Sequence, residues 1–305
     1  MISYYYRGKR GEELQTLDEF RVGTWIHVEN PNTEELEHLT EHFGVDEGVL
    51  HDALDPHEVP RIDHSDKLTS FFVRVPRNTK NETITSPLLF VMSEKFIMTI
   101  TGESASVFKG FVSGSLEFHT TQKTQFLLLF LAEINRNYQR FVNQISRGVR
   151  KISVSVTKIG DKEIVQFVQF ERTLNDFLGA LNPMNNAIEE ILHEKYFKLY
   201  EDDKELMEDL SLSEEQLMRL CVSNLRAIVN VRSAYSTILT NNLNRTIKLL
   251  TMITIVLTVP TMIAGLFGMN VRLPVDPTSG SVFWLILAGS VALGIIIFFL
   301  IERRR

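Results

Sequence analysis

The spacing of apolar residues changes along the chain and divides it into three stretches. In residues 1–118, short alternating or continuous apolar runs predict strands, and helical spacing predicts helices over Thr33–Phe43 and Asp46–Leu54. After residue 118, apolar residues recur every three or four positions, which predicts long helices. The region that follows residue 248 is almost free of charge. The clearest strand candidates are residues 22–28, Thr69–Val75, Leu88–Val91 and Phe96–Ile100.

Three helical stretches are predicted between residues 119 and 212. The first two cover Phe126–Val156 and Lys162–Leu181, and Pro183 should end the second because proline lacks the N–H that a helix needs. The third, Ala187–Leu210, is highly charged but keeps helical spacing. We therefore expect these residues to form a helical bundle.

A new and very long helix is predicted to begin after residue 212. Ser213 and Gln216 form a capping box, in which their side chains satisfy free backbone N–H groups at a helix start. No Pro or Gly follows before Pro260, so the helix should run over Glu214–Phe267, about 80 Å at 1.5 Å per residue. Such a helix is far longer than is usual in globular proteins and would form a stalk that enters a membrane.

Two uncharged segments near the C-terminus are each long enough to cross a bilayer. Leu249–Phe267 contains nineteen residues and Val282–Ile301 contains twenty; about twenty apolar residues span the hydrocarbon core. A buried core helix is the alternative for the first segment, but a soluble fold rarely needs two such segments in succession. The sequence therefore predicts a membrane protein with two transmembrane spans.

Basic residues lie on one side of these two spans. Arg245 and Lys248 precede the first span and residues 303–305 follow the second, whereas the connecting loop, residues 269–281, carries only Arg272. By the positive-inside rule, both termini are cytoplasmic and the loop faces outward, which predicts a location in the cell membrane.

A stripe of polar and small residues follows one side of the long helix at heptad spacing. A coiled coil would carry Leu or Ile at these positions. Any single threonine in a membrane helix is explained by a bond to its own backbone, but a continuous stripe indicates a water-filled pore lined by one helix from each subunit. The stripe consists of Ser223, Arg226, Asn230, Ser233, Thr237, Thr240, Asn244, Ile247, Thr251, Thr254, Thr258, Thr261, Gly265 and Gly268.

The stripe also predicts a gate and an oligomer. Ile247 is its one bulky apolar residue, and a ring of Ile247 with the neighbouring Leu250 would close a pore by dewetting. One helix cannot enclose a pore, and the second span has no such stripe. A closed pore wall therefore requires a homo-oligomer with the first span at its axis, most simply a cyclic ring of subunits surrounded by membrane lipid.

Composition narrows the function further. The net charge of −6 argues against a nucleic-acid partner, which usually needs a basic face. The single cysteine, Cys221, is best explained as a packed small hydrophobic residue. The sequence has no nucleotide-binding loop, no nucleophile–base pair and no redox motif, so we expect neither an enzyme nor an organic cofactor.

The segment Pro260–Asn270, PTMIAGLFGMN, resembles the signature of CorA-type magnesium channels, in which a first span ends on Gly-Met-Asn. Pro60–Asp63 and Phe71–Pro76 are similar to the N-terminal domain of that family. The resemblance extends to the whole architecture, with an α/β domain, a helical stalk, two C-terminal spans and a basic tail. It implies an α+β membrane protein that assembles as a funnel-shaped homopentamer.

The resemblance also implies roles for individual residues. Gly268, Met269 and Asn270 would form the outer selectivity filter, where Asn270 carbonyls hold the transported Mg²⁺ through its waters because Mg²⁺ gives up water reluctantly. Other pore positions of the family match Asn244, Ile247, Leu250 and Thr261, and its basic ring around the cytoplasmic pore end matches Lys248, Arg303, Arg304 and Arg305.

Three departures from the family pattern concern acidic residues. Some members carry an acidic residue low in the pore, where this chain has Ser233, with Arg226 lower still. The outer loop carries Asp276 as its sole carboxylate, beside Arg272, where the family often has Met-Pro-Glu-Leu. The family's regulatory Mg²⁺ site uses an Asp just after the strand that matches residues 69–75, whereas this chain has residues 77–80, RNTK, and no carboxylate before Glu82. Inhibition by intracellular Mg²⁺ at that position is therefore not expected.

Other clusters of charged and metal-ligating residues have simpler explanations. His38 and His42 share a helix face with Glu34 and Glu41, and a solvated face explains them better than a transition-metal site. His51, Asp52, Asp55 and His57 suit capping and turn roles. An acidic run is most simply a solvated face too, and its alternative is a weak cytoplasmic cation site; it contains Glu201, Asp202, Asp203, Glu208 and Asp209.

The leading interpretation is a passive channel for hydrated Mg²⁺, with Co²⁺ and Ni²⁺ as further ions. A zinc transporter or divalent exporter of the same fold is the first alternative. A membrane-anchored scaffold or sensor is the second, although an anchor needs no polar stripe.

The predicted division is residues 1–118 as the cytoplasmic α/β domain, 119–212 as the bundle, 213–268 as stalk and first span, 269–281 as loop, 282–301 as second span and 302–305 as tail.

Overall fold

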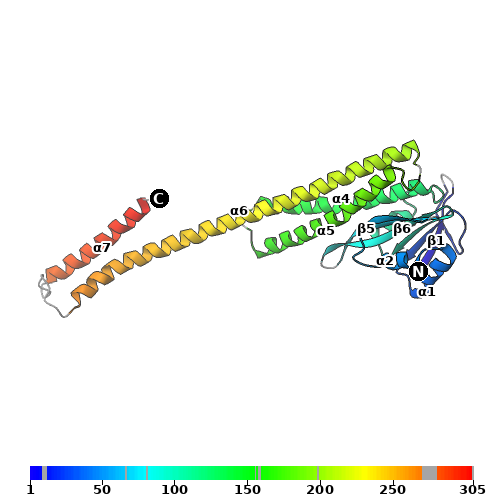
Figure 1. The fold of residues 1–305 in the computed structure, drawn as a ribbon. Helices are drawn as coiled ribbons and strands as arrows, with labels where there is room; N and C mark the ends of the chain where they lie inside the picture. The colour runs from blue at the N-terminus through cyan, green and yellow to red at the C-terminus, as the bar shows by residue number, and fades with distance from the viewer. Residues whose placement is uncertain are drawn as a thin grey trace. The chain divides into compact units, whose positions relative to one another are not determined.

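The structure is a computed structural model of residues 1–305. It describes the chain except residues 9–11, 66, 80–81, 155, 157–158, 198, 270–279 and 304–305, and the side chains of 282 and 300–302. The chain divides into two compact units, Met1–Arg232 and Ser233–Arg305. Figure 1 shows a sheet with helices on it in the first unit, whereas the described part of the second unit is helical.

A seven-stranded mixed sheet forms the base of the first unit (Figure 1). Its strand order is β2-β1-β3-β7-β6-β5-β4; β3 and β7 run parallel, and the other neighbours are antiparallel. The predicted strands are confirmed, with β5 and β6 longer than expected. The strands are β1 (Ile2–Tyr6), β2 (Gln15–Leu17), β3 (Thr24–Glu29), β4 (Arg61–His64), β5 (Leu68–Asn78), β6 (Thr83–Ser93) and β7 (Phe96–Thr101).

Both faces of the sheet are buried. Because successive strand residues point to opposite faces, Ile26 packs into a cluster with residues of α1 (Thr33–Phe43) and α2 (Glu47–Asp52). The neighbouring Trp25 lies on the other face, where its ring centroid is 5.3 Å from that of Phe126 in α4 (Lys123–Ser153). Two short segments, η1 (Ser106–Phe108) and α3 (Lys109–Val112), contribute further aromatic rings to that second face.

The helix α1 has the bounds that the sequence predicted, because both of its ends are capped. The Asn32 side chain accepts the Glu35 N–H, the Glu35 carboxylate accepts the Asn32 N–H, and Gly44 takes the left-handed conformation at the C-terminal end. The Asp46 side chain caps α2 in the same way, accepting the N–H groups of Gly48 and Val49.

The predicted break at Pro183 is wrong. Helix α5 runs without interruption over Asp161–Leu192. The carbonyl of Gly179 loses its helical partner to Pro183, but Gly179 is exposed, so water can reach that carbonyl. Phe177 and Leu181 before the proline and Met184 after it are all buried, and their burial outweighs the roughly 3 kcal/mol that an interior proline costs.

The predicted helix start at Ser213 is also wrong. Helix α6 is continuous over Glu201–Phe267. The predicted separate helix Ala187–Leu210 is wrong as well, because its first residues end α5 and its last ten begin α6. Ser213 caps nothing; its hydroxyl accepts a hydrogen bond of 2.9 Å from Asn135 Nδ2 of α4. The capping-box pattern occurs in mid-helix because burial of that side of α6 holds the backbone helical.

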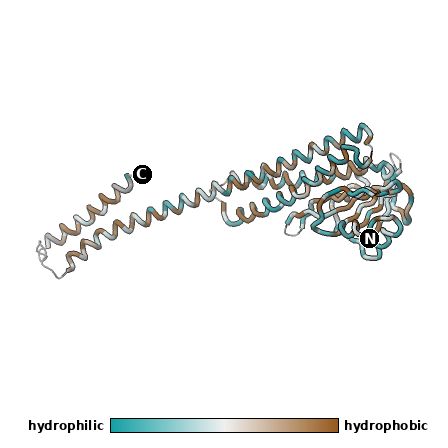
Figure 2. Tube along the Cα trace, in the orientation of Figure 1, coloured by the Kyte–Doolittle hydropathy of each residue, from teal (hydrophilic) through white to brown (hydrophobic). Residues whose placement is uncertain are grey.

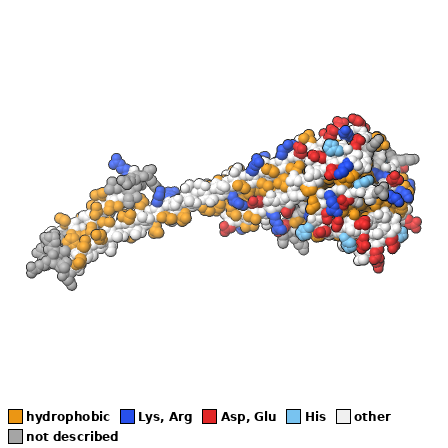
Figure 3. All heavy atoms as spheres, viewed as in Figure 1, with side chains coloured by type: hydrophobic (Ala, Val, Ile, Leu, Met, Phe, Trp, Pro, Cys, Tyr) orange, Lys and Arg blue, Asp and Glu red, His pale blue; other side chains and the backbone are white. Residues whose placement is uncertain are grey.

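In the second unit, the C-terminal part of α6 is followed by α7 (Gly280–Arg303). Both are apolar along most of their length (Figure 2). Within the described residues, α6 is long and apolar enough to cross a membrane, and α7 contributes a shorter apolar stretch, Phe283–Phe299. Acidic side chains crowd the visible surface of the first unit and are sparse on that of the second (Figure 3).

Candidate ion pathway along helix α6

The N-terminal part of α6 is held in place by one buried side. The residues on this side follow steps of three and four and lie inside a bundle with α4 and α5. Three amide–hydroxyl hydrogen bonds fix its register: Asn135 to Ser213 at 2.9 Å, Asn224 to Ser146 at 2.8 Å, and Ser211 to Asn185 at 3.1 Å. We call this side the bundle seam; it consists of Asp203, Met207, Leu210, Glu214, Leu217, Cys221, Asn224 and Ile228.

The predicted polar stripe, called the pore seam below, lies on a different side of α6. Ser223 is exposed although Cys221, two residues before it, is buried. In the same way, Arg226 is exposed although Asn224, two residues before it, is buried. Two residues turn an α-helix by roughly 200°, so the two seams face nearly opposite directions. Every one of the fourteen pore-seam positions from Ser223 to Gly268 is exposed. The described chain therefore covers none of the pore seam itself.

The threonines of the pore seam bond back to their own helix. The hydroxyls of Thr251 and Thr254 each donate to the carbonyl four residues earlier at 2.9 Å, and those of Thr258 and Thr261 do so at 2.7 and 2.8 Å. Each hydroxyl has a single proton, so its exposed oxygen is left as an acceptor only. These four threonines thus offer lone pairs and no hydroxyl protons.

Helix α7 packs against α6 on a side away from these threonines. Ser290 is buried, and a Cβ added to Gly294 would lie 3.7 Å from the Val256 carbonyl oxygen, so the two backbones approach closely. Pro260 has no N–H to donate to that carbonyl, which frees it to face Gly294. Small residues at a helix contact are what close packing within a bilayer requires. The small pair Ser290 and Gly294, spaced by four, was the sequence signal for this contact, and our sequence reading missed it.

The predicted gate and the flanks of the pore seam are exposed as well. Ile247 is 52 % and Leu250 63 % exposed, so in a single chain they have nothing to close against. A shallow groove runs beside the threonines, lined by Leu250, Ile253, Leu257 and Met262 together with Thr254, Thr258 and Thr261. Apolar flanks beside a polar stripe suit contact with further copies of the same helix.

The predicted selectivity filter lies at the end of α6. The Gly268 N–H still donates to the Ala264 carbonyl at 3.0 Å, and Met269 follows directly. Asn270 lies outside the described residues, as do Arg304 and Arg305 of the predicted basic ring. The two described members of that ring, Lys248 and Arg303, are both exposed, as is Asn244.

The acidic and histidine clusters do not form a metal centre in one chain. Within the described ranges, no three His, Cys, Asp or Glu side chains converge to hold an ion. Asp203 is buried in the bundle seam, whereas Glu201, Asp202, Glu208 and Asp209 are exposed. The ring centroids of His38 and His42 lie 4.2 Å apart with the rings tilted by 33°, and His42 is exposed.

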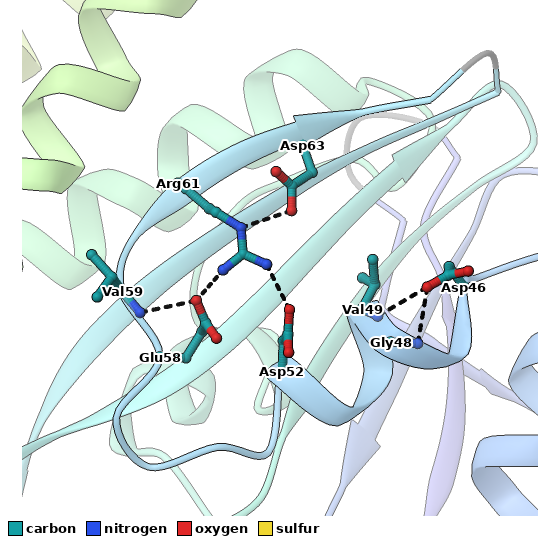
Figure 4. Close-up of polar contacts among 8 residues, drawn as sticks. All are labelled: Asp46, Gly48, Val49, Asp52, Glu58, Val59, Arg61 and Asp63. Atoms are coloured by element: carbon teal, nitrogen blue, oxygen red, sulfur yellow. Dashed lines mark hydrogen bonds and ion pairs between the residues drawn. The ribbon is translucent and has the colours of Figure 1, made fainter.

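Several acidic residues of the first unit form ion pairs with arginines. Arg77 pairs with Glu103, and Arg172 pairs with Glu82 at 3.1 Å, so Glu82 already has a cationic partner. In Figure 4, the Arg61 guanidinium reaches Asp52, Glu58 and Asp63, which are thereby held by a built-in cation. These pairs, with the Asp46 cap in the same view, are structural.

Comparison with known proteins places these features in a family. A model of the CorA-like Mg²⁺ transporter proteins matches residues 21–304. The chain is 25 % identical over 300 residues to the cobalt/magnesium transport protein CorA of Methanocaldococcus jannaschii, covering 95 % of this chain and 92 % of that protein.

Two solved structures share the fold over the full length of the chain. The complete CorA magnesium transporter of Methanocaldococcus jannaschii has a TM-score of 0.85 at 22 % identity, covering 100 % of this chain and 98 % of that one. The full-length CmaX protein has a TM-score of 0.77 at 17 % identity, covering 100 % and 97 %. The predicted resemblance is confirmed, and this chain belongs to the family of CorA-like Mg²⁺ transporter proteins.

Proposed function

We propose that this protein is a channel that conducts hydrated Mg²⁺ down its electrochemical gradient, with Co²⁺ and Ni²⁺ as further ions. The pathway is the pore seam of α6, enclosed by a homo-oligomer with α6 at its axis. Five copies are the number that the family resemblance implies. Both termini are cytoplasmic, and α6 and α7 each cross the membrane.

One observation carries this proposal. The pore seam is exposed along its whole length, although the bundle seam is buried in the first unit and α7 packs on another side in the second. A lipid-facing helix has no need of four hydroxyl groups in register, and polar residues at membrane depth normally face a water-filled cavity. A ring of α6 helices provides that cavity and covers the apolar flanks at the same time.

The chemistry of the seam favours a hydrated cation. Water molecules around Mg²⁺ direct their protons outward, so the first surface they meet should accept hydrogen bonds. The threonine oxygens do so, because their own protons are already donated to helix carbonyls. An anion would need donors instead. Neutral acceptors bind a divalent ion weakly, as conduction requires.

Asn270 is the proposed selectivity residue, with Gly268 and Met269 before it. A ring of amide oxygens would hold Mg²⁺ through its waters without dehydrating it. At the other end, Ile247 and Leu250 would form the hydrophobic constriction, while Lys248 and Arg303–Arg305 would surround it with positive charge. The relative from Methanocaldococcus jannaschii is named for cobalt and magnesium transport, which supports the same choice of ions here.

Ion flux into liposomes tests this function directly. Purified full-length protein should carry Mg²⁺, and Asn270→Ala should reduce the preference for Mg²⁺ over monovalent ions by at least about tenfold, the loss of one discriminating interaction. Asn242→Ala is the matched control, because Asn242 is an exposed asparagine of α6 outside the pore seam, and its flux should equal that of the wild type.

Each alternative has its own outcome in this experiment. Zn²⁺ carried in preference to Mg²⁺ would identify a zinc transporter of the same fold. Absence of flux for Mg²⁺, Co²⁺ and Zn²⁺ from protein that still unfolds cooperatively would indicate the membrane-anchored scaffold. Unchanged selectivity in Asn270→Ala would remove Asn270 from the filter while leaving the pore seam in place.

A further inference from the structure

The bundle seam contains a carboxyl group with no partner. The Glu214 side chain is fully buried, and neither of its oxygens has a hydrogen-bond partner among the described residues. Its sequence neighbours Ser213 and Glu215 do have partners, Asn135 and Arg219. Buried carboxyl groups are normally paired or hydrogen-bonded, since an ionised one left alone is very costly. The position of Glu214 on the pore-lining helix therefore calls for an explanation.

Among the described residues, no cation pairs with Glu214. Tyr138 of α4 lies close enough for an ionised Glu214 to raise the pKa of the Tyr138 hydroxyl. That hydroxyl donates a hydrogen bond of 2.9 Å to the backbone carbonyl of Arg74 in β5. The Arg74 guanidinium is occupied by Thr85 and by the Glu58 carbonyl. On α6 itself, burial raises the pKa of the Cys221 thiol to about 12, so Cys221 stays neutral as well. Burial likewise raises the pKa of the Tyr138 hydroxyl.

Burial alone raises the pKa of Glu214 to about 8, from an ordinary value of 4.5. At neutral pH its side chain is mostly protonated inside the bundle. If α6 moves away from α4, water reaches the carboxyl group and its pKa returns toward the ordinary value, so the proton is released. Opening of the bundle and loss of this proton are thus thermodynamically linked.

We infer that Glu214 is a proton-operated latch, which holds the cytoplasmic half of helix α6 in its bundle while it is protonated and loosens that contact when it is not. The two observations behind this are its complete burial without a partner and its place in the seam that joins α6 to α4 and α5. Because α6 continues unbroken to Phe267, the latch acts on the same helix that carries the pore seam.

The sign of the pH effect follows from the direction of the shift. A folded-state pKa above the ordinary one stabilises the closed bundle fully below about pH 4.5, and this contribution is lost as pH rises toward 8. Between these limits the equilibrium constant for opening should rise about tenfold for each pH unit, and above pH 8 it should level off.

Cys221 is a built-in reporter for this opening. It is the only cysteine of the chain, it is fully buried, and it lies two helical turns beyond Glu214 on the bundle seam. We suggest measuring the rate at which a maleimide labels Cys221 in full-length protein in detergent from pH 5.5 to 9. The thiol itself reacts faster at higher pH, and this dependence is the same in every variant. The ratio of the labelling rates of two variants at one pH therefore reports only the effect of residue 214 on opening.

The informative ratio is that of wild type to Glu214→Gln, which has no proton to lose. It should rise by about thirtyfold or more between pH 6 and pH 8 and then flatten, as the linkage requires. Glu214→Met, which also removes the unpaired polar group, should give the same result and replaces Glu214→Gln if that variant does not fold. The control Glu215→Gln changes the adjacent glutamate, which is partly exposed, and should follow the wild type. A ratio that stays constant over this range would overturn the latch.

A second measurement connects the latch to transport and rests on the proposed function. In liposomes, the ratio of Mg²⁺ flux at cytoplasmic-side pH 8 to that at pH 6 should differ from one in the wild type and return to one in Glu214→Gln. Absence of flux from all variants would contradict the proposed channel, while the labelling ratio would still decide the latch. Equal pH dependence of flux in wild type and Glu214→Gln would show that the latch does not control the pore.

Discussion

The two stretches of helix α6 obey opposite rules. From Asp203 to Ile228, the helix buries mostly apolar residues and leaves its polar side exposed, as expected for a bundle in water. From Thr251 to Thr261, apolar residues such as Leu257 are exposed and the hydroxyl groups run in a stripe of their own. Water drives apolar side chains together in the first stretch, whereas a bilayer, in which we propose that the second stretch lies, gives no such drive.

The contacts made by the two stretches differ accordingly. The bundle seam relies on side-chain volume, with amide–hydroxyl pairs such as Asn135 and Ser213 setting its register. The contact between α6 and α7 relies on small residues, Ser290 and Gly294, which let backbones approach. Buried apolar area stabilises the bundle seam, whereas close backbone approach stabilises the contact between α6 and α7. The same kind of mutation should therefore change stability differently in the two stretches.

The largest difference should come from truncating a leucine in each stretch. Leu217→Ala removes a side chain that is 4 % exposed, and it should lower the free energy of unfolding by about 3 kcal/mol through lost burial and the cavity left behind. Leu257→Ala removes a side chain of the second unit that is 64 % exposed in the single chain, and it should change the free energy of unfolding of the first unit by less than about 0.5 kcal/mol, even where further copies of α6 cover it.

Urea unfolding of the full-length protein in detergent would measure both changes. In a Trp284→Phe background, the emission of Trp25, which is buried in the first unit, follows the α/β domain and its bundle. Equal losses for Leu217→Ala and Leu257→Ala would show that the two stretches are stabilised in the same way, against the comparison made above.

Most elements could be predicted from the sequence, and the failures have a common cause. Helix α1 ends where predicted because its signals, Asn32 and Gly44, act within the helix itself. Pro183 and Ser213 carry equally clear local signals, yet α5 and α6 pass through both. There, buried contacts with neighbouring helices outweigh a local preference of a few kcal/mol, and one sequence does not reveal those contacts.

The candidate site divides in the same way. The pore seam was predictable because heptad spacing alone places residues on one side of a helix. Glu214 was not, because its spacing fits an ordinary charged helix and its significance depends on burial against α4. The filter residue Asn270 was assigned from the family motif, and that assignment stays a prediction.

The next effect concerns the hydroxyl groups of the pore seam. Replacing Thr254 and Thr258 together by the near-isosteric valine removes two rings of acceptors from an oligomer. It should reduce Mg²⁺ flux about thirtyfold, because two lost hydrogen bonds at about 1 kcal/mol each total about 2 kcal/mol. Thr246→Val is the matched control, because the Thr246 hydroxyl also bonds back, to Asn242 at 3.0 Å, but lies outside the pore seam. Reduced flux in Thr246→Val of the same size would mean that threonines act on the helix itself and not on the ion.

The smallest effect should come from the contact between α6 and α7. A methyl group at Gly294 would meet the Val256 carbonyl oxygen at 3.7 Å and its Cγ1 at 3.8 Å, which is ordinary van der Waals contact. Gly294→Ala should therefore leave thermal stability in detergent within about 0.5 kcal/mol of that of Gly289→Ala, a substitution that meets no atom within 4 Å. Gly294→Ile should destabilise the contact by about 1–3 kcal/mol, because its branched atoms would lie closer to Val256 than the Cβ does and push the two backbones apart. If Gly294→Ile were as stable as Gly294→Ala, close backbone approach would not be what joins α7 to α6, and the contrast between volume in the bundle and shape in the membrane would fail.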